Sequence, residues 1–166
     1  MPYDNICKTL VELNPLPFVR WLVGDPTEPI QILKTELTVE PIRADFVSFL
    51  QVGSQILHLE FQTDPDPNMP LRMLDYYVRL RRQYQCQILQ VVLFLRQTQS
   101  QWVTVDQFVS QTTWHQYRVF RLWEVRAEQL LGESHLWPLA VLAFSDPPVA
   151  ILREVACRIQ ALENHR

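Results

Sequence analysis

The spacing of apolar residues divides the chain into predicted helices and strands. In residues 4–23 apolar side chains recur every three or four positions, which is typical of an amphipathic helix, and Pro15 and Pro17 are expected to kink or break it. Residues 70–83 begin with a proline and predict another helix. Residues 147–164 repeat the helical spacing and predict a closing helix. Its expected apolar face consists of Val149, Leu152, Val155, Ile159 and Leu162.

Shorter runs with alternating or continuous apolar residues predict strands. Residues 32–40, 42–50 and 56–63 are expected to form three strands, and the last two would join in a hairpin centred on Gly53-Ser54. Residues 88–95 are almost wholly apolar, as in a strand buried on both faces. The order helix, three strands, helix, strand predicts an α/β fold with a mixed central sheet flanked by helices.

The C-terminal half has a weaker pattern. Residues 102–109 and 116–125 are further strand candidates, and residues 126–131 predict a short helix. Residues 136–144 are apolar and fit either a helix or a strand. The length of 166 residues, with no repeat or linker, predicts one domain over 1–166, with a core at about 5–95 and an extension at about 96–166.

Composition and charge narrow the class of protein. Hydrophobic residues make up 48% and charged residues 20%, which indicates a globular chain. The net charge of −3 disfavours a general nucleic-acid coat protein but leaves room for an enzyme that acts on DNA. Three scattered cysteines without a CxxC pair indicate a reducing compartment. No signal-peptide region or membrane-length apolar run is visible, so we expect a cytoplasmic, soluble protein without a membrane partner.

Two acids interrupt the apolar runs of the predicted hairpin. A turn at Gly53-Ser54 pairs positions whose numbers sum to 107, so Asp45 would face Gln62, with Glu60 diagonally adjacent on the same face. Diagonal neighbours lie about 7–8 Å apart at the backbone, within reach of one shared ion. Two carboxylates on one face repel each other unless a cation or a proton lies between them. The pattern predicts a divalent-metal site; the alternative is a pair of edge-strand acids without function.

The stretch ELTVEPIRADFVSFL…ILHLEFQTDPDPNMPLRMLDYYVRL resembles the PD-(D/E)XK nuclease superfamily. Within that superfamily it is similar to the Rpn group, the recombination-promoting nucleases or transposase-like proteins, including cyanobacterial members. The resemblance covers about residues 5–95 and extends less clearly to 131. It implies a restriction-endonuclease-like core of order α-β-β-β-α-β. It assigns the first acid to Asp45 and the second to Glu60, and it puts Gln62 where lysine is usual.

The chemistry implied by this resemblance suits the residues. Mg²⁺, or Mn²⁺ in its place, takes hard oxygen ligands and commonly one or two carboxylates. Asp45 and Glu60 would supply these carboxylates, and the backbone carbonyl of Phe61 would add an oxygen. The ion would polarise a phosphodiester and lower the pKa of a bound water. Gln62 would orient that water or contact the phosphate, although it carries no charge and cannot shuttle a proton as lysine does.

Further residues follow from the same resemblance. Arg72 and Tyr76 lie four apart on one helix face, where they would contact the phosphate and an active-site side chain. Their alternative role is an exposed arginine stacked along a neighbouring ring. Glu12 and Glu36 are candidates for extra acids near the metal, or ordinary solvated residues. His58 shares the Glu60 face by alternation, and we expect a core histidine there rather than a ligand.

These observations lead to a functional prediction with open alternatives. We expect a Mg²⁺-dependent DNA endonuclease that acts as a homodimer, because cutting both strands of a duplex needs two sites or a rebinding step. A non-catalytic module on the same fold is the second reading, with the tryptophan-rich residues 102–137 binding a protein or a second copy. A ribonuclease is the third, because a metal site that acts on phosphate does not select the sugar.

Overall fold

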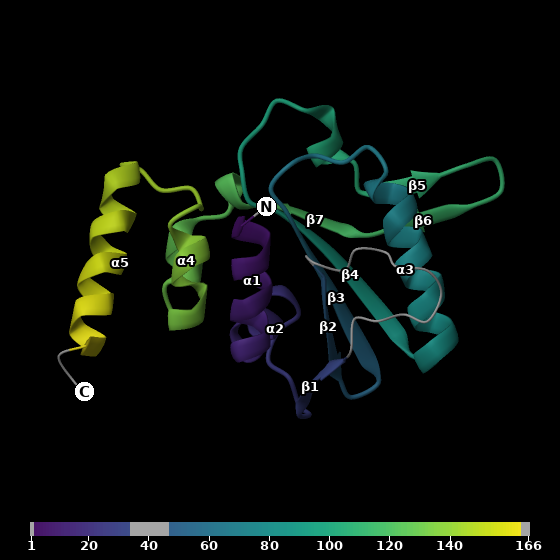
Figure 1. Ribbon diagram of the computed structural model, residues 1–166, viewed down its shortest axis with the longest axis horizontal. Helices are drawn as coiled ribbons and strands as arrows, with labels where there is room; N and C mark the ends of the chain where they lie inside the picture. Colours follow the sequence, from purple (N-terminus) through teal and green to yellow (C-terminus); the bar gives the residue numbers. More distant parts are fainter. Residues whose placement is uncertain (1, 34–46, 164–166) are drawn as a thin grey trace.

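A five-stranded mixed sheet forms the centre of the protein (Figure 1). The structure, a computed structural model, describes residues 2–33 and 47–163. β2 is antiparallel to both of its neighbours, whereas β3, β4 and β7 are parallel. The strands, in the order in which they lie in the sheet, are β1 (Ile30–Leu33), β2 (Val47–Val52), β3 (Gln55–Gln62), β4 (Gln87–Phe94) and β7 (Arg118–Arg121).

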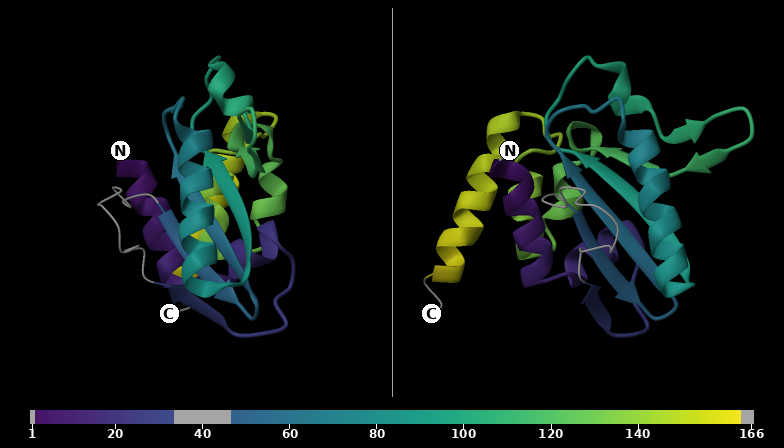
Figure 2. Two further views of the ribbon diagram at one scale, coloured as in Figure 1. Left: turned by 90° about the vertical axis from the view of Figure 1, so that its right-hand side faces the viewer. Right: turned by 45° about the vertical axis from the view of Figure 1, so that its right-hand side comes forward.

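Helices cover both faces of this sheet. α3 (Met69–Tyr84) lies on one face, and α1 (Pro2–Leu13), α2 (Leu16–Leu22) and α4 (Trp137–Ala140) lie on the other (Figures 1 and 2). α5 (Pro148–Glu163) lies outside α4, at the end of the molecule away from α3 (Figure 1). The predicted α/β architecture, a mixed sheet flanked by helices, is therefore confirmed.

The β2–β3 hairpin has the predicted register. Val47 pairs with Glu60 and Val52 with Gln55, so the paired numbers sum to 107. Gly53 has a φ of +54°, a conformation that glycine adopts at low cost and that tight hairpin turns require. Asp45 lies outside the described residues, so its pairing opposite Gln62 stays a prediction.

The β3–α3–β4 unit places a helix over the hairpin. β3 and β4 are parallel, and parallel neighbours need a crossover, which α3 supplies. The helix has a proline at its start, as predicted, and it ends before Gln85, which has a left-handed φ of 52°. Its buried side chains are Met69, Met73, Tyr76 and Leu80. The face that carries Tyr76 is therefore packed against the sheet, while Leu71 is exposed.

The N-terminal helix breaks where the prolines predicted a break. α1 ends at Leu13 and α2 begins at Leu16, with Pro15 as the residue before its first turn. A proline cannot continue the hydrogen bonding of a preceding helix, so the chain changes direction there. Gly24, with a φ of +114°, follows the last residues of α2.

The C-terminal half differs most from prediction. The strand expected at 102–109 is wrong in its first part, because the chain there forms the 3₁₀ helix η1 (Gln101–Thr104), which is capped by the Ser100 hydroxyl. Within the expected range, the strand that forms is β5 (Gln107–Val109). In the range 116–125, where one strand was expected, the strand β7 ends at Arg121 and the chain then forms the 3₁₀ helix η2 (Leu122–Glu124). A short apolar run does not distinguish a strand from a 3₁₀ turn, because four residues are too few to show whether the apolar spacing is two or three. The other elements are β6 (Trp114–Gln116), η3 (Ala127–Leu130) and η4 (Ser134–Leu136).

α5 forms as predicted, but Val155 is the one residue of its expected apolar face that is buried. Ile151 and Val155 belong to the core, whereas most of the expected apolar face is exposed. The exposed residues of that face are Val149, Leu152, Ile159 and Leu162. Apolar residues occur on more than one side of this helix, so periodicity alone could not select the buried side. In the part of the chain that the structure describes, no helix is both long enough and apolar enough to cross a membrane.

Candidate functional site

The row of polar side chains on β3 marks the candidate site. Alternation along the strand places His58, Glu60 and Gln62 on the face covered by α3, with exposed fractions of 0%, 2% and 8%. The intervening side chains, Leu59 and Phe61, point to the opposite face and join its apolar core. A buried carboxylate is uncommon and requires compensating partners. The register of this strand therefore buries the acid Glu60 in the interior of the protein.

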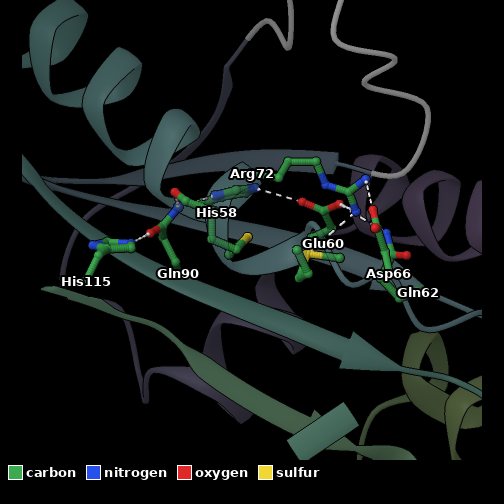
Figure 3. Close-up of polar contacts among 9 residues, drawn as sticks. His58, Glu60, Gln62, Asp66, Arg72, Gln90 and His115 are labelled. Atoms are coloured by element: carbon green, nitrogen blue, oxygen red, sulfur yellow. Dashed lines mark hydrogen bonds and ion pairs between the residues drawn. The ribbon is translucent and has the colours of Figure 1, made fainter. Parts of the chain in front are cut away.

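Two side chains bind the same carboxylate oxygen of Glu60. Arg72 of α3 places Nη2 2.5 Å from Glu60 Oε1, and the amide Nε2 of Gln62 donates to the same oxygen at 3.0 Å (Figure 3). Arg72 also binds Asp66, with Nη1 3.1 Å from Oδ2. The guanidinium thus bridges two carboxylates, and the Arg72 side chain as a whole is 27% exposed. Asp66 precedes α3 and escaped the sequence prediction.

The second carboxylate oxygen of Glu60 has no hydrogen-bond partner among the described residues. His58 Nε2 lies 3.6 Å from this oxygen, Oε2, which is too long for a hydrogen bond. The Tyr76 hydroxyl is also buried without a described partner, and its ring lies 4.8 Å from the His58 ring. Burial lowers the pKa of His58, while burial and the charge of Glu60 raise the pKa of Tyr76. Both groups are therefore neutral at pH 7.

Gln90 and His115 extend this polar cluster away from Glu60. Gln90 lies on β4 opposite His58 in the parallel register, and its Nε2 is 2.8 Å from His58 Nδ1. Its Oε1 is 2.6 Å from Nε2 of His115 on β6 (Figure 3). Neither residue had a predicted role. One signal was present: Gln90 is the only polar residue of the apolar run 88–95, and a buried amide implies partners.

Several predicted residues meet in the structure. Glu60, Gln62 and Arg72 are in contact, and Tyr76 lies beside His58 in the same layer. The alternative of an exposed arginine stacked along a ring does not describe Arg72, because its guanidinium is engaged by two carboxylates. The backbone of Phe61 lies between Glu60 and Gln62 on β3.

Of the remaining predicted acids, only Glu12 belongs to the part of the chain that the structure describes, and it does not lie beside Glu60. Asp45 and Glu36 lie outside the described residues. Glu12 is exposed on α1, on the other face of the sheet, and its described ion pair is with Lys8 at 3.9 Å. Among the described residues, Asp66 is therefore the one further carboxylate next to the Arg72–Glu60 pair.

One oxygen among the described residues has the chemistry of a metal ligand. Oε2 of Glu60 is a buried anionic oxygen without a hydrogen-bond partner, which suits a hard cation such as Mg²⁺. Within residues 2–33 and 47–163, no group of three or more histidine, cysteine or acidic residues is placed to hold a metal. The donor set thus fits one carboxylate of a metal site, and the second carboxylate would have to come from Asp45.

A separate cavity of about 640 Å³ lies beside β4 and β7. Its lining includes Gln90, Asp106, Arg118 and Arg121, but Glu60 is not part of it. Both arginines bind partners outside the cavity lining. Arg118 donates to the carbonyl of Leu22, and Arg121 forms an ion pair with Glu124. The cavity therefore borders the outer part of the polar cluster rather than the carboxylate.

A scan against protein-family models and searches of the curated proteins and of the solved structures found no match to this chain.

Proposed function

We propose that this protein is a divalent-metal-dependent nuclease that hydrolyses phosphodiester bonds in DNA, with Glu60 as the described carboxylate of its metal site. The observation that carries this proposal is the state of Glu60. It is buried and charge-compensated at Oε1, yet Oε2 has no hydrogen-bond partner among the described residues. Leaving a buried carboxylate oxygen without a partner costs stability, so function is a reason to retain it.

The arrangement of elements supports the same proposal. Helices, three strands, a helix and a strand follow one another from α1 to β4, which agrees with the order implied by the resemblance to PD-(D/E)XK nucleases. Glu60 and Gln62 lie two residues apart on β3, and Arg72 and Tyr76 come from the next helix. The proposed fold is therefore the restriction-endonuclease-like core, one form of the α/β architecture described above.

The residues around Glu60 suit hydrolysis with bound Mg²⁺ or Mn²⁺. When bound, such an ion supplies Lewis-acid activation of the phosphate and of a water molecule. Glu60 would hold it through Oε2, together with Asp45 and the carbonyl of Phe61. Gln62 would position water by its amide oxygen, because its amide nitrogen already donates to Glu60. Arg72 would carry the phosphate contact.

A second copy of the chain completes the proposal. Cleavage of both strands of a duplex needs two sites or a rebinding step, so we propose a homodimer. The exposed apolar side chains of α5 support it, because exposed apolar residues gathered on one element are typical of interfaces. These residues are Val149, Leu152, Ile159 and Leu162.

Plasmid nicking tests the catalytic proposal. The full chain is expected to nick supercoiled DNA with Mg²⁺ or Mn²⁺ and not with EDTA. Glu60→Gln and Asp45→Asn are each expected to lose about 100-fold or more of the rate, because metal binding supplies several kcal/mol of transition-state stabilisation. Glu128→Gln changes an exposed acid on η3 and serves as the control. Equal rates in all four proteins would remove the nuclease assignment.

A non-catalytic module on the same fold is the second candidate. The observation in its favour is the Arg72–Glu60 pair, which already neutralises the carboxylate. Its binding surface would include Trp114, which is 65% exposed on β6. Absence of nicking, together with a binding partner lost on Trp114→Ser, is the result that distinguishes it. Digestion of RNA beside DNA decides between the nuclease readings.

A further inference from the structure

A continuous row of side chains links Glu60 to the other side of α3. It runs from Glu60 through His58 and Gln90 to His115 (Figure 3). Gln90 is 3% exposed and lies between the two imidazoles. Because every member but His115 is buried, the direction of each hydrogen bond has consequences for Glu60.

The backbone determines how the Gln90 amide is oriented. Its Nε2 lies 2.8 Å from the carbonyl oxygen of Met73, and a carbonyl can only accept. The same Nε2 lies 2.8 Å from His58 Nδ1, so its second hydrogen is directed there. Rotating the amide by 180° would put Oε1 against the Met73 carbonyl, with two acceptors facing each other. Gln90 therefore donates to His58 and, through Oε1, accepts from His115 Nε2 at 2.6 Å.

The tautomer of His58 follows from that orientation. A neutral imidazole that accepts at Nδ1 carries its proton on Nε2. His58 Nε2 has no described partner except Glu60 Oε2 at 3.6 Å, and Oε2 has none except His58. The ring cannot turn away freely, because Tyr76 and Phe49 contact it with centroids at 4.8 and 5.1 Å.

We propose that His58 is a positioning residue for Glu60, held as the Nε2–H tautomer by Gln90 and His115, and not a metal ligand. A protonated Nε2 has no lone pair to offer a cation, but it directs an N–H group at the carboxylate. Gln62 and Arg72 bind Oε1, whereas the His58 N–H faces Oε2 across 3.6 Å, an electrostatic contact longer than a hydrogen bond that favours this rotamer of Glu60. The role assigned to Glu60 rests on the proposed nuclease function, whereas the tautomer does not.

The tautomer can be measured on the wild-type full chain without metal. Long-range ¹H–¹⁵N correlation spectra distinguish a protonated ring nitrogen from an unprotonated one, and loss of one spin system in His58→Gln assigns the signals. The expected pattern is Nε2 protonated and Nδ1 unprotonated for His58. A His58 signal with the proton on Nδ1 overturns the proposal, whatever the protein does to DNA.

A matched pair of variants measures the positioning effect. His58→Leu removes the donor, whereas His58→Gln can place an amide N–H near the position of Nε2. Mn²⁺ affinity, followed by electron paramagnetic resonance, is expected to fall by about 10- to 100-fold in His58→Leu, the range typical of residues that orient a ligand. His58→Gln is expected to recover most of that loss. Thermal unfolding of both variants checks that they are folded.

The outcomes separate this inference from the proposed function. If the wild type binds no Mn²⁺ while His58 shows the Nε2–H tautomer, the metal proposal fails and the hydrogen-bonded chain stands. If the wild type binds Mn²⁺ and His58→Leu binds it equally well, the positioning role is wrong. If His58→Gln loses as much affinity as His58→Leu, donation to Glu60 is not what His58 contributes. Should His58→Leu not fold, the wild-type spectrum still decides the tautomer.

Discussion

The two faces of the central sheet bury different kinds of side chain. The face covered by α1, α2 and α4 has one continuous apolar cluster, which includes Leu57, Leu59 and Phe61 of β3. The face covered by α3 has two smaller clusters, one around Phe49 and Leu80 and one around Met73 and Val92. His58, Glu60 and Gln90 belong to neither cluster.

The difference shows where stability and chemistry are located. An apolar cluster needs only complementary packing, and each side chain contributes through area removed from water. A buried polar row needs a specific partner for every donor and acceptor, and one missing partner leaves a destabilising group. The α3 face carries such groups at Glu60 Oε2 and the Tyr76 hydroxyl. The free energy gained by burying the apolar cluster offsets the cost of these unpartnered polar groups.

The largest effect on stability is expected on the apolar face. Phe61→Ala should lower the free energy of unfolding by about 3–5 kcal/mol, because it removes a fully buried ring and leaves a cavity. Urea denaturation followed by circular dichroism measures the change. Val109→Ala changes an exposed apolar residue and should stay within about 0.5 kcal/mol. A loss below 1 kcal/mol in Phe61→Ala would contradict the packed core described for this face.

On the α3 face, we expect the free energy of unfolding to depend more on the charged partner of Glu60 than on the apolar area that is buried. Arg72→Met is expected to cost about 3 kcal/mol at neutral pH, because it leaves the charge of Glu60 buried without its cation. Adding Glu60→Leu should restore most of this loss, because the unpaired charge is then gone as well. Urea denaturation of both variants gives the comparison, with Arg79→Met as the control, since its pair with Asp75 is more exposed. Equal stability of the single and double variants would refute the coupling.

α5 carries the same contrast within one helix. Ile151 is 6% exposed and belongs to the apolar cluster, whereas Ile159 is 45% exposed. Ile151→Ala should cost about 2 kcal/mol and Ile159→Ala less than about 0.5 kcal/mol for the monomer. If α5 joins two copies, Ile159→Ser should weaken the dimer in analytical ultracentrifugation while leaving the monomer folded. A dimer unaffected by Ile159→Ser would place the contact elsewhere.

The smallest effect concerns a single hydroxyl. Tyr117 donates to the Val105 carbonyl at 2.9 Å, so Tyr117→Phe should cost about 1 kcal/mol at pH 8. Burial raises the pKa of Tyr117 above its ordinary value of 10.0. The unfolded chain then ionises first, so this contribution is present below pH 10 and is lost as the pH rises further. Between pH 8 and 11 the variant should therefore lose less stability than the wild type; parallel losses would argue against the shift.

Local sequence was sufficient for much of the core. The Gly53-Ser54 turn and the alternation of apolar residues predicted the register that pairs Val47 with Glu60. Pro15 predicted the break between α1 and α2. Tertiary contacts overrode the pattern elsewhere. The expected apolar face of α5 is mostly exposed, and residues 101–104 are a 3₁₀ helix instead of a strand.

For the candidate site, the sequence by itself determined that His58, Glu60 and Gln62 share one side of a strand, because side chains alternate with a period of two. Their partners depended on the tertiary structure. Arg72 meets Glu60 because α3 crosses from β3 to β4, and Gln90 meets His58 because these strands are parallel and in register. Such contacts join residues far apart in the chain, so no local spacing encodes them; they follow from how the elements pack.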